Sequence, residues 1–234
     1  MDVRRFARLF DHSIVRPDAT TADVERYAEV AARLGTATLT VQPHYVRLAA
    51  GLLRGTGVLV GTVVGFPHGN ETASMKRYQA NEVLELGAEE IDMVMNIPAL
   101  KNGERDLFTR DVAGVVGAAA GVRVKVILEN CLLRQEEKER ACEWIAETGA
   151  HFVKTSTAYA AGGATLEDVR LMMRAVRGRC LVKAAGGIRA ASEVLSYLQA
   201  GARRFGSTRT EELVRGFEAL SPDERAAFGG FLET

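Results

Sequence analysis

Short apolar runs alternate with longer segments of helical periodicity along the whole chain. The first run, residues 10–15, is followed by Thr20 and Asp23, which are spaced as a helix N-cap and its acidic partner. Apolar side chains then recur at positions 24, 27, 28, 31 and 34, the spacing of one helix face. The pattern predicts a strand followed by a helix.

The same alternation continues to the end of the chain. The predicted strands are residues 10–15, 36–41, 58–64, 90–96, 122–128, 151–154, 180–184 and 203–206. The predicted helices cover about 43–53, 72–86 and 103–119, then a stripe at positions 141, 144, 145 and 148, a segment capped by Thr165 and Asp168, a stripe at positions 191, 194, 195 and 198, and one or two helices after the last strand. A polar turn is expected before the first strand.

Eight strand and helix pairs at intervals of roughly 25 to 30 residues are what a closed barrel requires. The sequence therefore predicts the α/β class and a (β/α)8 TIM barrel, with residues 1–234 as a single domain. An open, doubly wound sheet is the alternative. That fold would favour a Gly-x-Gly-x-x-Gly turn after the first strand, whereas residues 11–16 read Asp-His-Ser-Ile-Val-Arg.

The amino-acid composition limits the classes of binding partner that are expected. Thirty basic and thirty acidic side chains cancel, so neither a nucleic acid nor an anionic membrane is an expected partner, and any anionic ligand must be held by local geometry. No apolar run approaches the length of a membrane span. The three cysteines are unevenly spaced and no leader-like segment opens the chain, which favours reduced thiols in the cytoplasm. The four histidines lack the spacing of a zinc site, so no metal is expected.

Two lysines stand out because each ends an apolar, strand-like run. Lys154 follows His-Phe-Val and Lys183 follows Cys-Leu-Val, and each precedes a loop. Lysine is among the residues least often buried, since an ammonium is costly to remove from water. In such barrels the active site lies at the carboxyl ends of the strands, so the two lysines predict one site. Lys125 is expected to lie deeper in the barrel and is the weaker candidate.

If the two lysines are neighbours, one can lower the pKa of the other and so make it a nucleophile. A free lysine has a pKa near about 10.4, and lowering it by about three units requires roughly 4 kcal/mol. Burial and a neighbouring cation both lower it, so one lysine could act as a neutral nucleophile while the other remains charged. The alternative is that both lysines are structural, paired with carboxylates or extended to the rim. Asp92, on the inward face of the fourth strand, favours the catalytic interpretation as a proton relay.

Further inward polar groups and two glycine-containing loops complete the predicted site. Asp11, Asn96 and Glu129 are candidates to hold a substrate hydroxyl or to tether the lysines. The loops after the seventh and eighth strands commonly bind phosphate in this fold. The phosphate-binding candidates are Gly186, Gly187, Gly206, Ser207 and Thr208. Thr208 and Glu211 also have the spacing of a helix capping box.

Six motifs resemble one known family over nearly the whole chain. They are Phe10-Asp-His-Ser-Ile-Val-Arg-Pro17, Val63-Val-Gly-Phe-Pro-His-Gly69, Glu90-Ile-Asp-Met-Val-Met-Asn96, Lys125-Val-Ile-Leu-Glu129, Phe152-Val-Lys-Thr-Ser-Thr157 and Val182-Lys-Ala-Ala-Gly-Gly-Ile-Arg189. The chain resembles the 2-deoxy-D-ribose-5-phosphate aldolases, the DeoC-type class I aldolases. The resemblance implies a role in deoxyribose phosphate catabolism, in which a phosphorylated sugar is reversibly cleaved to glyceraldehyde 3-phosphate and acetaldehyde without a metal or an organic cofactor.

The resemblance also implies a role for each candidate. Lys154 matches the Schiff-base nucleophile, Lys183 the lysine that tunes it and exchanges protons, and Asp92 the acid/base aspartate. The glycines at 186 and 187 and the loop from Gly206 match the phosphate-binding residues. A homo-oligomer, a dimer or tetramer, is expected. Two rival interpretations remain: another lysine-dependent phosphosugar aldolase, and a catalytically silent sugar-phosphate-binding relative.

The chain departs from the usual family pattern at several positions. These are Arg16, Thr40, Gln42, Ala158, Tyr159 and Arg209. Arg209 either strengthens phosphate binding through charge-assisted hydrogen bonds or occludes the site. The C-terminal segment, residues 221–234, either covers the site or packs elsewhere. The resemblance leaves both alternatives open.

Overall fold

Eight parallel strands close into a barrel in the computed structural model, which describes residues 1–231. The strands are β1 (Phe10–Ile14), β2 (Thr38–Val41), β3 (Leu59–Val64), β4 (Glu90–Val94), β5 (Arg123–Ile127), β6 (Phe152–Lys154), β7 (Leu181–Ala185) and β8 (Ala202–Ser207). The ring closes where β8 pairs with β1, with Phe10 opposite Phe205 and Asp11 opposite Gly206. The predicted (β/α)8 barrel is confirmed, and the open sheet is excluded.

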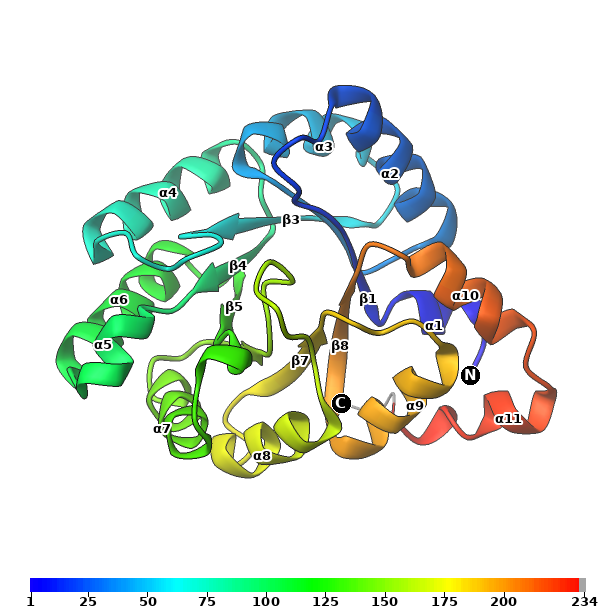
Figure 1. Ribbon diagram of the computed structural model, residues 1–234. Helices are drawn as coiled ribbons and strands as arrows, with labels where there is room; N and C mark the ends of the chain where they lie inside the picture. The colour runs from blue at the N-terminus through cyan, green and yellow to red at the C-terminus, as the bar shows by residue number, and fades with distance from the viewer. Residues whose placement is uncertain (232–234) are drawn as a thin grey trace.

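Helices surround the barrel on its outer side (Figure 1). They are α1 (Val3–Ala7), α2 (Thr21–Leu34), α3 (Val46–Leu52), α4 (Ala73–Glu85), α5 (Ile97–Asn102), α6 (Arg105–Ala118), α7 (Gln135–Ala146), α8 (Leu166–Val176), α9 (Ala191–Ala200), α10 (Thr210–Glu218) and α11 (Pro222–Ala226), with the short 3-10 helices η1 (Pro43–Tyr45), η2 (Asn130–Leu132) and η3 (Gly229–Phe231). Strands covered in this way are buried on both faces, as the continuous burial of β2 and β4 shows. Within residues 1–231, no helix is both long enough and apolar enough to span a bilayer.

The first outer helix illustrates how local sequence sets the boundaries. Thr20 Oγ1 accepts a hydrogen bond from the Asp23 N–H at 3.2 Å, and the Asp23 carboxylate accepts one from the Thr20 N–H at 3.1 Å. This is the predicted capping box. Gly35 ends α2 in the left-handed conformation, with φ of 71°, which a residue without a Cβ adopts at little cost.

The cap of α8 is also formed as predicted and offers a stability test. Thr165 Oγ1 accepts a hydrogen bond from the Asp168 N–H at 3.0 Å. We expect Thr165→Ala to lower the free energy of unfolding by about 1 kcal/mol, which is roughly 2–4 °C in Tm for a chain of this size. Thr109→Ala is the matched control, because Thr109 is a half-buried residue within α6 whose hydroxyl donates to the Arg105 and Asp106 carbonyls and caps no helix. Equal Tm values for both variants would contradict the capping role.

Helix α5 was not predicted, and its formation reassigns Asn96. The Asn96 side chain accepts a hydrogen bond from the Ala99 N–H at 3.0 Å, and Pro98 fits the first turn. The expectation that Asn96 holds a substrate hydroxyl or tethers a lysine is therefore wrong. Its side-chain oxygen is used to begin a helix, and β4 ends two residues earlier, at Val94.

Two other local predictions are corrected. The expected N-terminal turn is the helix α1, whose N-cap Asp2 accepts a hydrogen bond from the Arg5 N–H at 2.8 Å. The expected capping box of Thr208 and Glu211 does not form. Helix α10 begins at Thr210, and its N-cap, Arg209, makes no side-chain cap hydrogen bond. The Arg209 N–H instead donates to Ser207 Oγ at 2.9 Å.

The C-terminal segment, as far as Phe231, packs near the amino ends of the strands. Phe228 is buried in edge contact with Phe6 and Phe217, whose rings stack with centroids 4.2 Å apart. The amino group of Met1 donates to the Arg225 carbonyl at 3.1 Å. Of the predicted alternatives for this segment, packing away from the carboxyl ends of the strands is therefore correct through Phe231, and residues 232–234 lie outside the described residues.

Candidate active site

Four consecutive strands each contribute a charged side chain to one cluster inside the barrel. These residues are Asp92 on β4, Lys125 on β5, Lys154 on β6 and Lys183 on β7. The register sets Asp92 opposite Lys125 and Lys154 opposite Lys183. Because parallel strands keep their inward faces aligned, residues far apart in the sequence meet in one cluster.

The Asp92 carboxylate is the common acceptor for the three lysines. Its Oδ2 accepts hydrogen bonds from Lys154 Nζ at 2.7 Å and Lys183 Nζ at 2.6 Å, and its Oδ1 accepts one from Lys125 Nζ at 2.9 Å. All four side chains are buried. Lys125 lies opposite Phe152, two residues before Lys154, so it occupies the deeper position that the sequence predicts.

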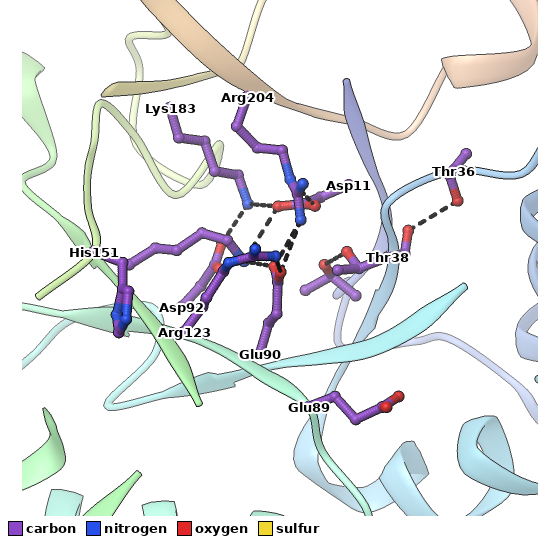
Figure 2. A network of polar contacts seen from close by, with 12 residues as sticks. Asp11, Thr36, Thr38, Glu89, Glu90, Asp92, Arg123, His151, Lys183 and Arg204 are labelled. Atoms are coloured by element: carbon purple, nitrogen blue, oxygen red, sulfur yellow. Dashed lines mark hydrogen bonds and ion pairs between the residues drawn. The ribbon is translucent and has the colours of Figure 1, made fainter. Parts of the chain in front are cut away.

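Below this cluster, further ion pairs extend the network toward the amino ends of the strands (Figure 2). Asp11 pairs with Lys183 and, at 2.7 Å, with Arg204 Nε. Glu90 accepts from Arg204 at 2.8 Å, from Arg123 at 3.1 Å and from Lys125 at 2.6 Å. The three carboxylates of the network thus face five cations: Arg123, Arg204, Lys125, Lys154 and Lys183.

This excess of positive charge controls the ionisation of the cluster. Burial alone would raise the pKa of Asp92, but the ammonium groups of Lys125, Lys154 and Lys183 hold its pKa well below the ordinary value. The pKa of Asp11 is likewise lowered, because Arg204, Lys125 and Lys183 outweigh its burial. Both aspartates are therefore carboxylates in the folded protein.

The fully buried lysines respond in opposite directions. Burial lowers the pKa of Lys183 to about 8, assisted by the charges of Lys154 and Lys125, although Asp11 and Asp92 oppose the change. Burial also acts on Lys125, but three carboxylates around its ammonium group outweigh it and raise its pKa. Lys183 is consequently the easier of the two to deprotonate.

Access distinguishes Lys154 from the other members of the cluster. It lines a cavity of about 270 Å³ at the carboxyl ends of the strands, whereas Asp92, Lys125 and Lys183 are buried and do not line this cavity. The cavity is also lined by the five phosphate-binding candidates: Gly186, Gly187, Gly206, Ser207 and Thr208. The structure therefore brings the Lys154 amine and the two predicted loops to the same cavity.

The glycine loop after β7 has a conformation suited to exposing backbone. Gly186 and Gly187 have φ of 86° and 83°, backbone values that residues with a side chain rarely adopt. A Cβ at Gly163 would lie 2.5 Å from the Gly186 carbonyl oxygen, so that loop packs directly on this backbone. Substitution at any of these three glycines would distort the cavity wall.

Gly206 also supports the lysine cluster. A Cβ at this position would lie 3.1 Å from Ala185 Cβ and 3.4 Å from Lys183 Cε. The absent side chain therefore leaves room for the stem of Lys183. Gly206 links the cavity wall to the buried lysine as well as lining the predicted phosphate site.

The other predicted inward groups differ in their contacts. Asp11 tethers Lys183, as one of the predicted alternatives states. Glu129 does not contact the lysines; its carboxylate accepts hydrogen bonds from the N–H and hydroxyl of Thr157, with Oε2 at 3.3 Å from the nitrogen. Since Thr157 lines the cavity, Glu129 fixes the loop after β6.

Glu90 and Arg204 are network residues that the sequence analysis missed. Glu90 has the same strand parity as Asp92, so the inward direction of its side chain was available from the sequence. Arg204 lies two residues before Gly206 and has the same parity. Its contacts with Asp11 and Glu90 depend on barrel closure, which the pattern of one strand does not specify.

Several positions that depart from the family pattern meet at the cavity mouth. The Tyr159 hydroxyl donates to the Val15 carbonyl at 2.8 Å, and its ring packs edge-on against Phe66 with centroids 5.3 Å apart. Tyr159 thereby joins the loops after β6, β1 and β3. Gln42 Nε2 also donates to the Val15 carbonyl, at 2.9 Å. These contacts hold the mouth in one arrangement.

Comparison with known proteins identifies the family. The model of the DeoC/LacD family aldolases matches residues 6–212. The chain belongs to this family. Among DeoC/LacD relatives, it is 50% identical to a deoxyribose-phosphate aldolase of Methanothermobacter thermautotrophicus over 90% of this chain and 94% of the relative. It is 44% identical to the Bacillus subtilis deoxyribose-phosphate aldolase, over 93% and 98% of the two chains.

Solved structures agree with this family assignment. The tetrameric deoxyribose phosphate aldolase of Aeropyrum pernix superposes with a TM-score of 0.86 at 30% identity, covering 94% of each chain. Within residues 1–231, no three His, Cys, Asp or Glu side chains are grouped as a metal site.

Proposed function

We propose that this DeoC/LacD family member is a class I aldolase that reversibly cleaves 2-deoxy-D-ribose 5-phosphate to D-glyceraldehyde 3-phosphate and acetaldehyde. The observation that carries the proposal is the position of Lys154, which is the lysine of the buried cluster that reaches the cavity. Relatives of similar length named deoxyribose-phosphate aldolase support the choice of substrate.

In the proposed reaction, Lys154 Nζ first gives up one proton, and the neutral amine attacks C1 of the open-chain sugar; the proton then returns as the carbinolamine loses water, forming an iminium ion. The C3 hydroxyl then loses its proton, the C2–C3 bond breaks, and its electron pair moves toward the iminium nitrogen. Glyceraldehyde 3-phosphate departs and an enamine remains. Protonation of the enamine carbon and addition of water release acetaldehyde and the free amine, so the lysine is regenerated.

Lys183 and Asp92 form the proposed proton-exchange pair. Asp92 Oδ2 contacts both Lys154 and Lys183, so it orients the nucleophile beside a second amine. A carboxylate with a strongly lowered pKa is a weak base, whereas a pKa of about 8 suits proton exchange near neutral pH. We propose that Lys183 is the main group that exchanges the proton. Asp92 relays the proton through a water molecule.

A pH dependence follows from these roles. Lys183 is an ammonium below its pKa of about 8 and neutral above it. If the ammonium is the working form, kcat/KM falls by about tenfold per pH unit above that value. A pH–rate profile with deoxyribose 5-phosphate measures this, with circular dichroism at each pH to show that the protein stays folded. A rise in kcat/KM through pH 8 would instead identify the neutral amine as the working form.

The loops after β7 and β8 form the proposed phosphate site. Arg209 is proposed to add a positively charged guanidinium group to it. Arg209 lines the cavity and pairs with Glu212. We expect Arg209→Ala to raise KM for deoxyribose 5-phosphate by roughly five- to tenfold through lost charge-assisted hydrogen bonds. KM for unphosphorylated deoxyribose should be unchanged. Arg215→Ala, on the same helix and 74% exposed, is the control. A lower KM in Arg209→Ala would mean that this side chain obstructs the site.

A direct assay tests the proposed activity. Purified protein is incubated with 2-deoxyribose 5-phosphate, and acetaldehyde and glyceraldehyde 3-phosphate are measured with coupled dehydrogenases. Other phosphorylated aldoses and ketoses serve as competing substrates. Faster cleavage of one of them would favour a different phosphosugar aldolase, and binding without cleavage of any would favour the catalytically silent relative.

The domain organisation, the cellular compartment and the assembly of the enzyme are also proposals. We propose a single domain over residues 1–234 that works in the cytoplasm as a homo-oligomer. The tetrameric relative supports the oligomer. The cysteines Cys131, Cys142 and Cys180 are free thiols, as expected in a reducing compartment. Size-exclusion chromatography with light scattering measures the assembly.

A further inference from the structure

A second cavity lies at the opposite mouth of the barrel. Its volume is about 490 Å³, and its walls include Phe152 and Leu181, which begin β6 and β7. Four arginines also line it: Arg123, Arg179, Arg203 and Arg204. No residue of this cavity lines the cavity at Lys154. In a chain with no net charge, four arginines lining one cavity are a local excess of basic residues that composition does not explain.

Among residues 1–231, the carboxylates that pair with these arginines do not balance their positive charge. Glu90 pairs with Arg123 and Arg204, and Asp11 pairs with Arg204, but both acids also serve buried lysines. The remaining two arginines bond only to backbone carbonyls within the described chain. Arg179 Nε donates to Val176 and Arg203 Nη1 to Leu198 and Ala202.

The other walls supply a neutral donor and apolar surface. His151 Nδ1 accepts a hydrogen bond from the Val124 N–H at 3.2 Å, so in the neutral ring the hydrogen is on Nε2. Leu9, Phe152 and Phe231 give the cavity apolar walls. The Arg203 guanidinium lies 5.9 Å from the centre of the Phe231 ring, within reach of a cation–π contact.

We propose that this cavity binds a multiply charged organic phosphate of about nucleotide size. Planar guanidinium groups match phosphate oxygens in bidentate geometry, which favours phosphate over a single carboxylate at a cluster of arginines. The volume falls within the range of about 300–1,000 Å³ usual for small-ligand pockets. The apolar walls accommodate the uncharged part of such a ligand.

Calorimetric titration of the full-length protein with ADP tests the proposal. The test variant is R179A/R203A, which removes the two guanidinium groups that have no carboxylate partner among residues 1–231. The matched control is R189A/R209A, which removes the same charge from the rim of the cavity at Lys154. We expect the wild type to bind ADP, R179A/R203A to bind it at least about tenfold more weakly, and the control to change the affinity by less than about twofold. Circular dichroism verifies that both variants are folded.

Three results would overturn the proposal. The first is no binding to the wild type at millimolar ADP. The second is equal weakening in both double variants, which means that ADP responds only to net charge. The third is weakening confined to R189A/R209A, which locates ADP at the catalytic cavity. The proposal stands only if the loss is specific to R179A/R203A.

Discussion

Replacing Lys154 by methionine is expected to lower kcat/KM by roughly four to six orders of magnitude, because the variant has no amine to form the iminium ion. Methionine has nearly the same length and packs well, so the cavity should keep its shape. The change also removes one of the three ammonium groups that contact Asp92. The initial rate of deoxyribose 5-phosphate cleavage measures the loss.

Borohydride trapping separates the roles of the two lysines. With acetaldehyde and borohydride, the wild type should give a reduced adduct on the peptide that contains Lys154, and K154M should give none there. K183M is the matched control, since it loses a buried lysine of the same cluster but keeps Lys154, the proposed nucleophile. It should still form the Lys154 adduct, only more slowly. An adduct on Lys183 in K154M, together with rapid turnover, would reverse the assignment.

Replacing Asp92 by asparagine is expected to impair both stability and activity. The carboxylate accepts from three buried ammonium groups, so the amide leaves uncompensated charge inside the barrel. Breaking a buried ion pair in this way costs about 3–5 kcal/mol. Loss of a positioned acid–base group lowers kcat by roughly two to four orders of magnitude. Urea titration and steady-state kinetics measure the two effects.

The control for this change is Asp18→Asn, which alters an exposed aspartate. Its partner Arg16 is 2.8 Å away and also bonds to Asp23, and such surface pairs contribute about 0–1 kcal/mol. D18N should therefore unfold almost like the wild type and retain its activity. If D92N were as stable as D18N, the lysines would have to be neutral in the folded protein. The ion-pair account of the cluster would then fail.

The fold was predictable because each strand carries its own signal. An apolar run of a few residues followed by a helical segment repeats eight times, and eight such units have one common closed arrangement. The hydrophobic pattern could not show which of two local structures a polar side chain would favour. Asn96 looked like the end of a strand, but its side chain caps α5, and Thr208 had capping spacing without a cap forming.

The candidate site was predictable in part for the same physical reason. Strand parity placed Lys154, Lys183 and Asp92 on inward faces, and the structure brings them together. The alternation of side chains along a strand could not show that Lys154 lines the cavity while Lys183, its neighbour in register, does not. Nor could it show Arg204 against Asp11 and Glu90, because these contacts require β8 to close on β1.

The location of the C-terminal segment has a practical consequence for immobilisation. Phe228 packs against Phe6 and Phe217, and Phe231 lies at the mouth opposite Lys154. A solid support or a fused enzyme attached close to Phe231 would therefore sit behind the barrel. Substrate would still enter from the free side, so such a conjugate should keep its turnover, whereas attachment near Tyr159 would block the entrance.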